Sequence, residues 1–301
     1  MIIFAAAPPT VPQPTTATPM LFVVITLSSR LPSILRSPKD AVNREARLER
    51  AFVDSAAKSI YKRYMRYDLL LLDLDGTLLD YNEGERHALR QVFSNLQLPF
   101  DEQLHPRVYR HINNELWNDY EAGHIDREYL RHTRFRRFFG EIGLAPDLIP
   151  DPDEFSEHYL SALAASAFLE EGARELLSSL HGRISLAVVS NGFAAVQYPR
   201  LEHARIRDYF DVVIVSDEVC CRKPEPAIFD AALRHPALGL EAEPERSRCL
   251  MVGDGIHSDM AGAMAYGMDS CWYNPEGLEF PLEQHPTYMV SRLSEVPTCL
   301  V

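Results

Sequence analysis

The stretch LLLLDLDGTLLDY, residues 69–81, places two acidic side chains directly after four consecutive leucines. Four apolar residues in a row are typical of a strand that is buried on both faces. Residues i and i+2 of an extended segment project to the same side, so Asp73 and Asp75 can face one common ligand. Burial of a carboxylate without a partner is costly. The stretch therefore predicts a buried strand that ends at a site holding a counter-charge.

Further apolar runs follow the first one along the chain. Short runs of this kind, separated by helical stretches, indicate a parallel sheet that helices cover on both faces. The expected strands are residues 69–72, 184–189, 212–215, 249–252, 270–273 and 288–290. The predicted fold class is α/β, with a Rossmann-like parallel sheet as its core.

The spacing of these runs divides the chain into regions. About 110 residues separate the first run from the second, whereas the later crossovers take roughly 20 to 35. Patterns with a period of 3.6 residues fill the long gap and indicate an all-helical insert. We expect an N-terminal extension at 1–64, an α/β core made of 65–82 and 168–301, and a helical insert at 83–167.

The N-terminal extension differs in composition from the rest of the chain. Residues 1–39 are rich in Pro, Thr and Ser and contain no acid. We expect the extension to be partly disordered without a targeting role, with one candidate helix at 40–64. An organellar transit peptide stays open as the alternative.

The charge balance limits the partners of the protein. The 301 residues carry a formal net charge of −13, with the acids spread along the chain. We therefore expect no nucleic-acid polymer and no membrane as partner, since both attract basic faces. A small phosphorylated substrate remains compatible, because a bound cation reverses the local field. The sequence does not fix the oligomeric state.

The cysteines bear on the cellular compartment. The chain has five, and none forms a C-x-x-C pair. Reduced thiols in a reducing compartment are therefore expected. This predicts a cytoplasmic location, with an organelle as the alternative if the extension is a transit peptide.

Acidic groups follow two of the expected strands, and in open parallel sheets ligands bind beyond the carboxyl ends of the strands. Like charges so close together repel unless a cation lies between them or one takes up a proton. Mg²⁺ fits such a site, because it binds a few carboxylates together with water and substrate phosphate. The candidate metal ligands are Asp73, Asp75, Asp254 and Asp259.

Groups that can bind phosphate oxygens follow two more of the expected strands, 184–189 and 212–215. They are the Ser190 hydroxyl, the backbone around Asn191 and Gly192, and the Lys223 ammonium. Each feature alone has an ordinary explanation: D-x-D is usually a solvated turn, a Lys before Pro a surface residue, and Asp259 a helix cap. Their occurrence in order at four strand ends argues for one shared site.

The same four segments resemble the motifs of a known superfamily. DLDGT, VVSNG, the lysine of RKPEPAIF and VGDGIHSD stand in the order and spacing of the haloacid dehalogenase-like hydrolases. The match extends from Tyr67 to the C-terminus, and it implies that the helical insert is the cap of that superfamily. The stretches LWNDYEAGHI, SNGFAAVQYPRLEHARIRDYFDVVIVSDEV and DSCWYNPEG further resemble the bacterial pyrimidine 5′-nucleotidase branch, which dephosphorylates nucleoside monophosphates. Two departures are Gly255, where a hydroxyl residue often stands, and Pro199, which is expected to interrupt the helix after the second motif.

The resemblance implies phosphomonoester hydrolysis through an aspartyl-phosphate. Asp73 would be the nucleophile, and Asp75 would protonate the leaving group and then activate water. Lys223 would neutralise charge on the phosphoryl group, and Thr77 would lie beside the substrate, hydrogen-bonded to one of the two catalytic carboxylates. Phosphatases and phosphomutases of this superfamily have a second acid two residues after the first, which similar dehalogenases lack. Asp75 therefore favours phosphate as the substrate group.

Three functions stay open. The first is an Mg²⁺-dependent phosphomonoester hydrolase acting on nucleoside 5′-monophosphates, as a pyrimidine 5′-nucleotidase does. The second is a phosphatase or phosphomutase of small sugar phosphates. The third is a non-catalytic binding scaffold, which the intact acids disfavour. Carbon–phosphorus cleavage requires a lysine in the cap, and no Lys occurs between Asp80 and Leu169.

The insert contains side chains that could contact a nucleobase, a sugar or a phosphate. Aromatic residues at helical spacing are more often core than ligand platforms. The candidates are Trp117, Tyr120, Phe135, Phe138 and Phe139, together with Arg134, Arg136 and Arg137. A base-binding role for this region rests on the resemblance, mainly on the stretch LWNDY.

Overall fold

The computed structural model describes residues 65–239 and 243–301, all of them within one compact unit, Phe52–Val301. The extension expected at 1–64, with its candidate helix, lies outside the described residues. Within the described ranges, no helix is both long and apolar enough to cross a membrane.

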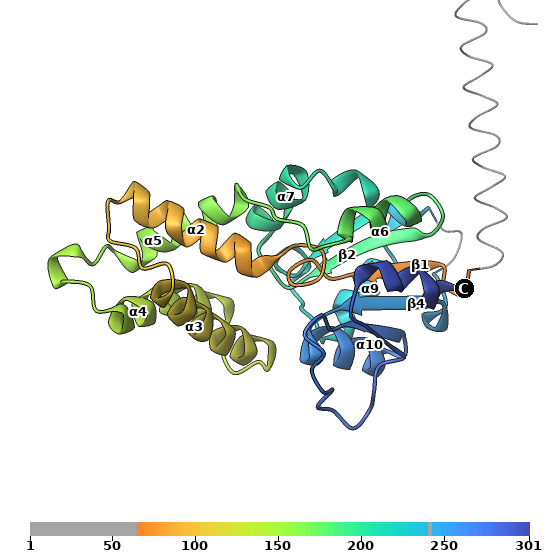
Figure 1. Ribbon diagram of the computed structural model, residues 1–301. Coiled ribbons are helices and arrows are strands. Elements are labelled where there is room, and N and C mark those ends of the chain that lie inside the picture. Colours follow the sequence, from red (N-terminus) through yellow and green to blue (C-terminus); the bar gives the residue numbers. More distant parts are fainter. Residues whose placement is uncertain (1–64, 240–242) are drawn as a thin grey trace, which may run out of the picture. The chain divides into compact units, whose positions relative to one another are not determined.

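Six strands form one sheet (Figure 1). They are β1 Leu69–Leu72, β2 Ser185–Ser190, β3 Val212–Val215, β4 Cys249–Gly253, β5 Asp269–Tyr273 and β6 Tyr288–Val290. Their order is β3-β2-β1-β4-β5-β6, and every neighbouring pair is parallel. The predicted α/β fold class and each predicted strand are confirmed, to within one residue at each strand end. The chain turns from one side of β1 to the other between β3 and β4, which places the expected ligand site beyond β1 and β4.

Helices connect the strands. Between β1 and β2 lie α2 Tyr81–Asn95, α3 Leu104–Glu121, α4 Arg127–Ile142 and α5 Pro152–Ala164. The later helices are α6 Ala173–Leu180, α7 Ala194–His203, α8 Ser216–Val219, α9 Pro226–Leu233 and α10 Ala261–Tyr266, with a π-helical turn at Ile256–Met260 before α10 and 3₁₀ turns at Leu293–Leu300. In Figure 1, α2 to α5 form a group of their own. The exact boundaries of the helical insert, expected at 83–167, stay a prediction.

The four leucines of β1 are all fully buried. Leu70 and Leu72 belong to the apolar cluster on one face of the sheet, and Leu69 and Leu71 belong to the cluster on the other face. This arrangement explains the uninterrupted apolar run, because both faces are covered. Each buried leucine contributes roughly 1.5–3 kcal/mol, which holds the end of β1 in place for the acids that follow.

The insert has an apolar core of its own, formed mainly by aromatic side chains. Tyr109 stacks on Phe135 with ring centroids 5.2 Å apart. Phe135, Phe138 and Phe139 are all buried in this core, which confirms the expectation that aromatic residues at helical spacing pack inside and leaves them unable to stack on a base. The regular spacing of these rings along α4 serves packing.

The arginines Arg134, Arg136 and Arg137 of α4 also contact other residues of the insert. Arg134 is buried against the rings of Tyr109, Phe135 and Tyr159. Arg136 pairs with Asp153 at 2.6 Å, and Arg137 pairs with Glu115 at 2.6 Å. In these positions they hold parts of the insert together, and none of them lines the cavity described below.

Helix α7 runs through Pro199, so the prediction that this proline interrupts the helix was wrong. Proline fixes φ at a value that a helix accepts, and α7 continues despite the lost hydrogen bond and the crowding of the proline ring against the carbonyl four residues back. The continuous helix matters for the site, because residues on both sides of Pro199 share one face.

Candidate active site

The turn after β1 brings the first motif against the fourth. Asp73 donates its backbone N–H to Val252 O at 2.9 Å, which continues the pairing of β1 with β4. Gly76 follows with φ +79°, and a Cβ at this position would lie 2.5 Å from Asp254 Oδ2. Only glycine therefore allows the turn to approach the Asp254 carboxylate so closely.

Thr77 fixes Asp254 in this arrangement. The Thr77 hydroxyl donates to Asp254 Oδ1 at 2.9 Å and accepts the Asp254 backbone N–H at 3.0 Å. The expected hydrogen bond from Thr77 to Asp73 or Asp75 is not the one formed, so that detail was wrong. The physical reason is the turn at Gly76, which points the threonine side chain toward the neighbouring strand end.

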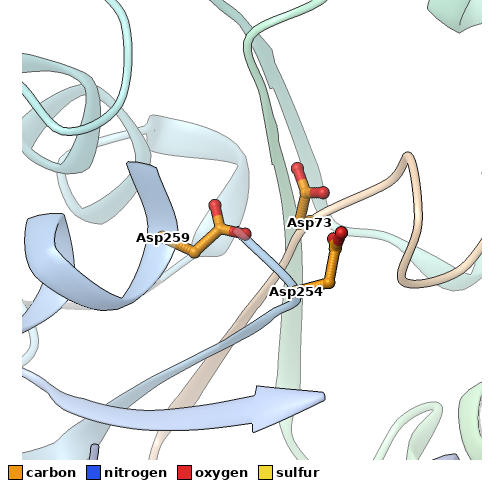
Figure 2. A group of neighbouring side chains, drawn as sticks. All are labelled: Asp73, Asp254 and Asp259. Carbon is orange, nitrogen blue, oxygen red and sulfur yellow. The ribbon is translucent and has the colours of Figure 1, made fainter. Parts of the chain in front are cut away.

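Three carboxylates converge beyond β1 and β4. Ligand atoms of Asp73, Asp254 and Asp259 lie within 4.8 Å of one another, and Figure 2 shows these side chains drawn together from β1, the loop after β4 and the π-helical turn. Burial, followed by the nearby Asp259 charge, raises the pKa of Asp254 to about 7. These three carboxylates repel one another, and their oxygen atoms are the donors that a hard divalent cation prefers. Such a cation would offset the repulsion when it binds.

Lys223 lies between two of these acids. Its ammonium contacts Asp73 Oδ1 and lies 2.7 Å from Asp259 Oδ1, and its side chain is almost fully buried. Burial lowers the pKa of Lys223, but the two carboxylates outweigh it and the pKa is raised. For Asp73 the balance is reversed: burial raises its pKa, and Lys223 opposes the increase. Lys223 is therefore a fixed positive charge at the end of β1.

Asn191 holds the loop that carries Lys223. Its carboxamide accepts the Lys223 backbone N–H at 2.8 Å and donates to the Lys223 carbonyl at 2.9 Å. The same amide nitrogen donates to Glu121 of α3 at 2.9 Å. The Asn191 side chain thus positions the lysine loop and joins it to the insert, whereas phosphate binding by the backbone around Asn191 and Gly192 stays a prediction.

Ser190 retains a free donor toward the site. Its oxygen accepts from the Gly192 backbone N–H at 3.1 Å and from Gln197 Nε2 at 2.9 Å. A hydroxyl has one proton to donate and two acceptor positions. Because both acceptor positions are used, the proton of Ser190 is available to an anionic oxygen in the cavity that it lines.

Asp75 is held by two side chains of α7 that the sequence did not single out. Gln197 Nε2 donates to Asp75 Oδ2 at 2.6 Å, and Arg200 forms an ion pair with Asp75 Oδ1. The Asp75 side chain lies outside the cluster of Asp73, Asp254 and Asp259. Gln197 and Arg200 are three residues apart and share a helix face, and that i, i+3 spacing just after the second motif was the available signal.

The insert closes the site from the other side. A cavity of about 240 Å³ contains Asp73, Asp75, Lys223, Asp254 and Asp259 on its core wall. On its other wall, the chain from α2 and α3 contributes Tyr81, Asn113, Asn114, Trp117 and Glu121. Sequence reasoning had named only Trp117 of these five.

Asn113 is a polar group without a full set of partners. Its Nδ2 donates to the Tyr81 hydroxyl at 3.3 Å, whereas its Oδ1 is buried and has no hydrogen-bond partner. Such an acceptor on a cavity wall fits a ligand donor. The arrangement as a whole combines a phosphoryl-binding end with a polar and aromatic end.

Comparison with known proteins identifies the class. A family model for haloacid dehalogenase-like hydrolases matches residues 67–267, and the chain belongs to this family. Among its relatives, the pyrimidine 5′-nucleotidase YjjG of Escherichia coli (strain K12) is 34% identical over 236 residues, which cover 78% of this chain and 99% of that protein. The pyrimidine 5′-nucleotidase PynA of Streptococcus pneumoniae is 33% identical over 237 residues, with 78% and 96% covered. The protein is therefore an enzyme, a hydrolase of the phosphatase type.

A solved structure supports the same family assignment. The HAD-hydrolase YfnB from Bacillus subtilis, bound to magnesium, superposes with a TM-score of 0.70 at 29% identity. The match covers 78% of this chain and 98% of that one. The predicted superfamily and the Rossmann-like fold are confirmed.

Proposed function

We propose that this enzyme is an Mg²⁺-dependent pyrimidine 5′-nucleotidase that hydrolyses nucleoside 5′-monophosphates through an aspartyl-phosphate on Asp73. The observation that carries the proposal is the convergence of Asp73, Asp254 and Lys223 at one end of a cavity that Asp75 also lines. A nucleophile, a metal site, a cation and an acid–base group thus surround one position for a phosphoryl group.

The metal ligands in this proposal are oxygen atoms of Asp73, Asp254 and Asp259, with Asp75 contributing its backbone carbonyl. When bound, Mg²⁺ supplies positive charge between the anionic nucleophile and the anionic ester. Thr77 holds Asp254 by the two hydrogen bonds described above. The remaining steps use groups of the chain itself.

In the first step, an Asp73 oxygen attacks phosphorus and the bond from phosphorus to the leaving oxygen breaks. Asp75 gives a proton to that oxygen, so the nucleoside leaves as an alcohol. In the second step, Asp75 takes a proton from water, which attacks phosphorus and releases Asp73. Lys223 and the Ser190 hydroxyl bind the phosphoryl oxygens and stabilise their charge.

The nucleotide preference is supported by the relatives and by the far wall of the cavity. Both relatives at 33–34% identity are pyrimidine 5′-nucleotidases by name. Trp117 offers an aromatic surface to a base. The Asn113 carboxamide, with its unpartnered Oδ1, can accept the N–H of a pyrimidine ring and reject analogues that lack it.

A substrate screen tests the proposal. UMP, dUMP, TMP, AMP and glucose 1-phosphate are incubated with the full chain and Mg²⁺, and inorganic phosphate is measured. Phosphate release from the pyrimidine nucleotides, abolished by EDTA, is expected. Conversion of glucose 1-phosphate into an isomer without phosphate release would indicate a phosphomutase, and no metal-dependent reaction with any ester would indicate a binding scaffold.

One relative supports a second candidate. The N-acylneuraminate-9-phosphatase of Rattus norvegicus is 27% identical over 243 residues, which cover 78% of this chain. Preferential hydrolysis of sugar phosphates in the same screen would favour this activity over nucleotide hydrolysis.

We also propose a cytoplasmic location. All five cysteines lie in the described part of the chain and none is in a disulfide, which fits a reducing compartment. An organelle is the alternative if residues 1–64 act as a transit peptide. Imaging of the full chain and of a chain lacking residues 1–64, each fused to a fluorescent protein, separates the two.

A further inference from the structure

Both oxygens of the Asp75 carboxylate are bound by buried side chains of α7. Gln197 Nε2 donates to Oδ2 at 2.6 Å, and the Arg200 guanidinium contacts Oδ1. Gln197 and Arg200 are each 1% exposed, whereas the Asp75 side chain is 28% exposed and lines the cavity. The carboxylate is thus held by two buried donors while it stays accessible from the cavity.

The two donors are linked to each other and to the second motif. Arg200 Nη1 donates to Gln197 Oε1 at 3.0 Å, and Gln197 Nε2 also donates to the Ser190 hydroxyl oxygen at 2.9 Å. A Cβ at Gly192 would lie 2.2 Å from Gln197 Nε2. Gly192 therefore provides the space that lets Gln197 reach Asp75, which gives the glycine of the second motif a specific task.

The contacts of Arg200 favour a role in the reaction over a role in stability. Its side-chain hydrogen bonds go to Asp75 and to Gln197, and its buried Nε and Nη2 have no hydrogen-bond partner. A buried ion pair is weak evidence for stability, because apolar residues of similar volume can replace it without loss. The guanidinium also lies over the Tyr81 ring, 5.7 Å from its centroid, at the start of the insert.

We propose that Gln197 and Arg200 are positioning residues for the acid–base step. They fix the Asp75 carboxylate so that it reaches the leaving oxygen in the first step and the attacking water in the second. The inference rests on the proposed function in one respect, namely that Asp75 is the acid–base group. It does not depend on which ester is the natural substrate.

The test uses two esters that differ in their need for a proton donor. p-Nitrophenolate leaves without protonation, whereas the 5′-alkoxide of UMP requires it. The variants Gln197→Leu and Arg200→Met are compared with the wild type by rapid quench, which measures release of the first equivalent of p-nitrophenolate or of uridine. General acid catalysis typically contributes 10²–10⁴-fold, so uridine release should slow by about 10²-fold.

In Arg200→Met, release of p-nitrophenolate should change by less than about 3-fold, because this ester bypasses the acid step. Gln197→Leu also removes the hydrogen bond to Ser190, so for this variant the expected result is a clearly larger loss with UMP than with p-nitrophenyl phosphate. The phosphorylated enzyme should then accumulate, since hydrolysis of the aspartyl-phosphate also uses Asp75. Equal losses with both esters, without accumulation, would overturn the proposal and indicate a structural role. Arg134→Met is the matched control, because Arg134 is an equally buried arginine whose hydrogen bond goes to Ser156 within the insert, and equal loss with both esters is expected of it.

Failure of the proposed function has a different signature. If the wild type hydrolyses glucose 1-phosphate but not UMP, the nucleotide preference falls, and the sugar ester replaces UMP in the same comparison. If no ester is hydrolysed, the acid–base role of Asp75 is refuted and the positioning role is refuted with it. Where an ester is hydrolysed, a crystal structure of the doubly substituted Gln197→Leu, Arg200→Met chain gives an independent measure: displacement of the Asp75 side chain supports the positioning role, and an unchanged Asp75 refutes it.

Discussion

Replacing Lys223 by methionine should destabilise the fold because it removes the one ammonium that separates Asp73 from Asp259. Methionine has a similar length, so the cavity left behind is small. The Lys223 side chain is 3% exposed, and those of Asp73 and Asp259 are 11% and 1% exposed. Removing one partner from a buried ion pair costs about 3–5 kcal/mol, since the other charge stays behind. Two carboxylates remain here, so the upper part of that range is expected in the absence of metal.

The loss of unfolding free energy in Lys223→Met should depend on pH and on Mg²⁺. Burial already raises the pKa of Asp73, and removal of Lys223 takes away the main opposing effect. The native variant therefore takes up a proton at a higher pH than the unfolded chain does. As the pH falls, the difference in unfolding free energy between the wild type and the variant becomes smaller. Mg²⁺ at about 100 times its dissociation constant should restore roughly 2.7 kcal/mol, provided that it binds only the native state.

The free energy of unfolding is measured by urea titration monitored by circular dichroism, at about pH 5 and about pH 8. Each titration is carried out once with EDTA and once with Mg²⁺. Arg234→Met is the control, because Arg234 is 58% exposed in its pairs with Asp230 and Glu243 and should cost about 0–1 kcal/mol. A Lys223→Met chain as stable as the wild type in EDTA at about pH 8 would refute the reasoning. So would a deficit that is the same at both pH values.

Three further outcomes are expected. Asp73→Asn should lower phosphate release by a factor on the order of 10³ or more with the circular dichroism spectrum unchanged, because an amide is a poor nucleophile; near-normal turnover would contradict the assignment. The pKa of Asp254 is raised to about 7, so between about pH 4 and about pH 7 the metal-free native state holds a proton that the unfolded chain lacks. The free energy of unfolding should therefore fall by up to about 1.4 kcal/mol for each unit by which the pH rises in this range. Mg²⁺ should flatten this slope in urea titrations, and a slope unchanged by Mg²⁺ would argue against a metal at this site. Trp117→Ala should raise KM for UMP about 10-fold and leave hydrolysis of ribose 5-phosphate, which has no aromatic ring, unchanged in steady-state assays, since stacking on a base is worth about 1–3 kcal/mol; equal effects on both esters would exclude base stacking.

The strands and the four motifs could be predicted because each has a local signal. A sheet covered on both faces demands continuous apolar runs such as 69–72 and 212–215, and these runs cannot be mistaken for surface elements. The groups after the runs are then brought together by the parallel topology alone. For that reason Asp73, Asp254 and Lys223 could be assigned to one site without coordinates.

The residues that position these groups could not be found in the same way. Gln197 and Arg200 are polar residues on a helix, and the usual expectation for such residues is a solvated face. Their burial follows from the rotation of α7 about its own axis, which packing against α5 determines and the sequence does not display. Thr77 was assigned the wrong partner for a related reason, since the direction of its side chain depends on the positive φ of Gly76.

The insert and the core meet at Asn191, which also holds the Lys223 backbone. Glu121, at the end of α3, accepts a hydrogen bond from Asn191 at 2.9 Å, and Asn191 binds both backbone groups of Lys223. Arg127 of the insert likewise donates to Ser216, in the segment after β3, at 2.7 Å. These contacts connect the cavity wall that carries Trp117 to the loop that carries Lys223. Substitutions on that wall can alter which ester enters, whereas a change at Glu121 also reaches the position of Lys223, because one amide group links them.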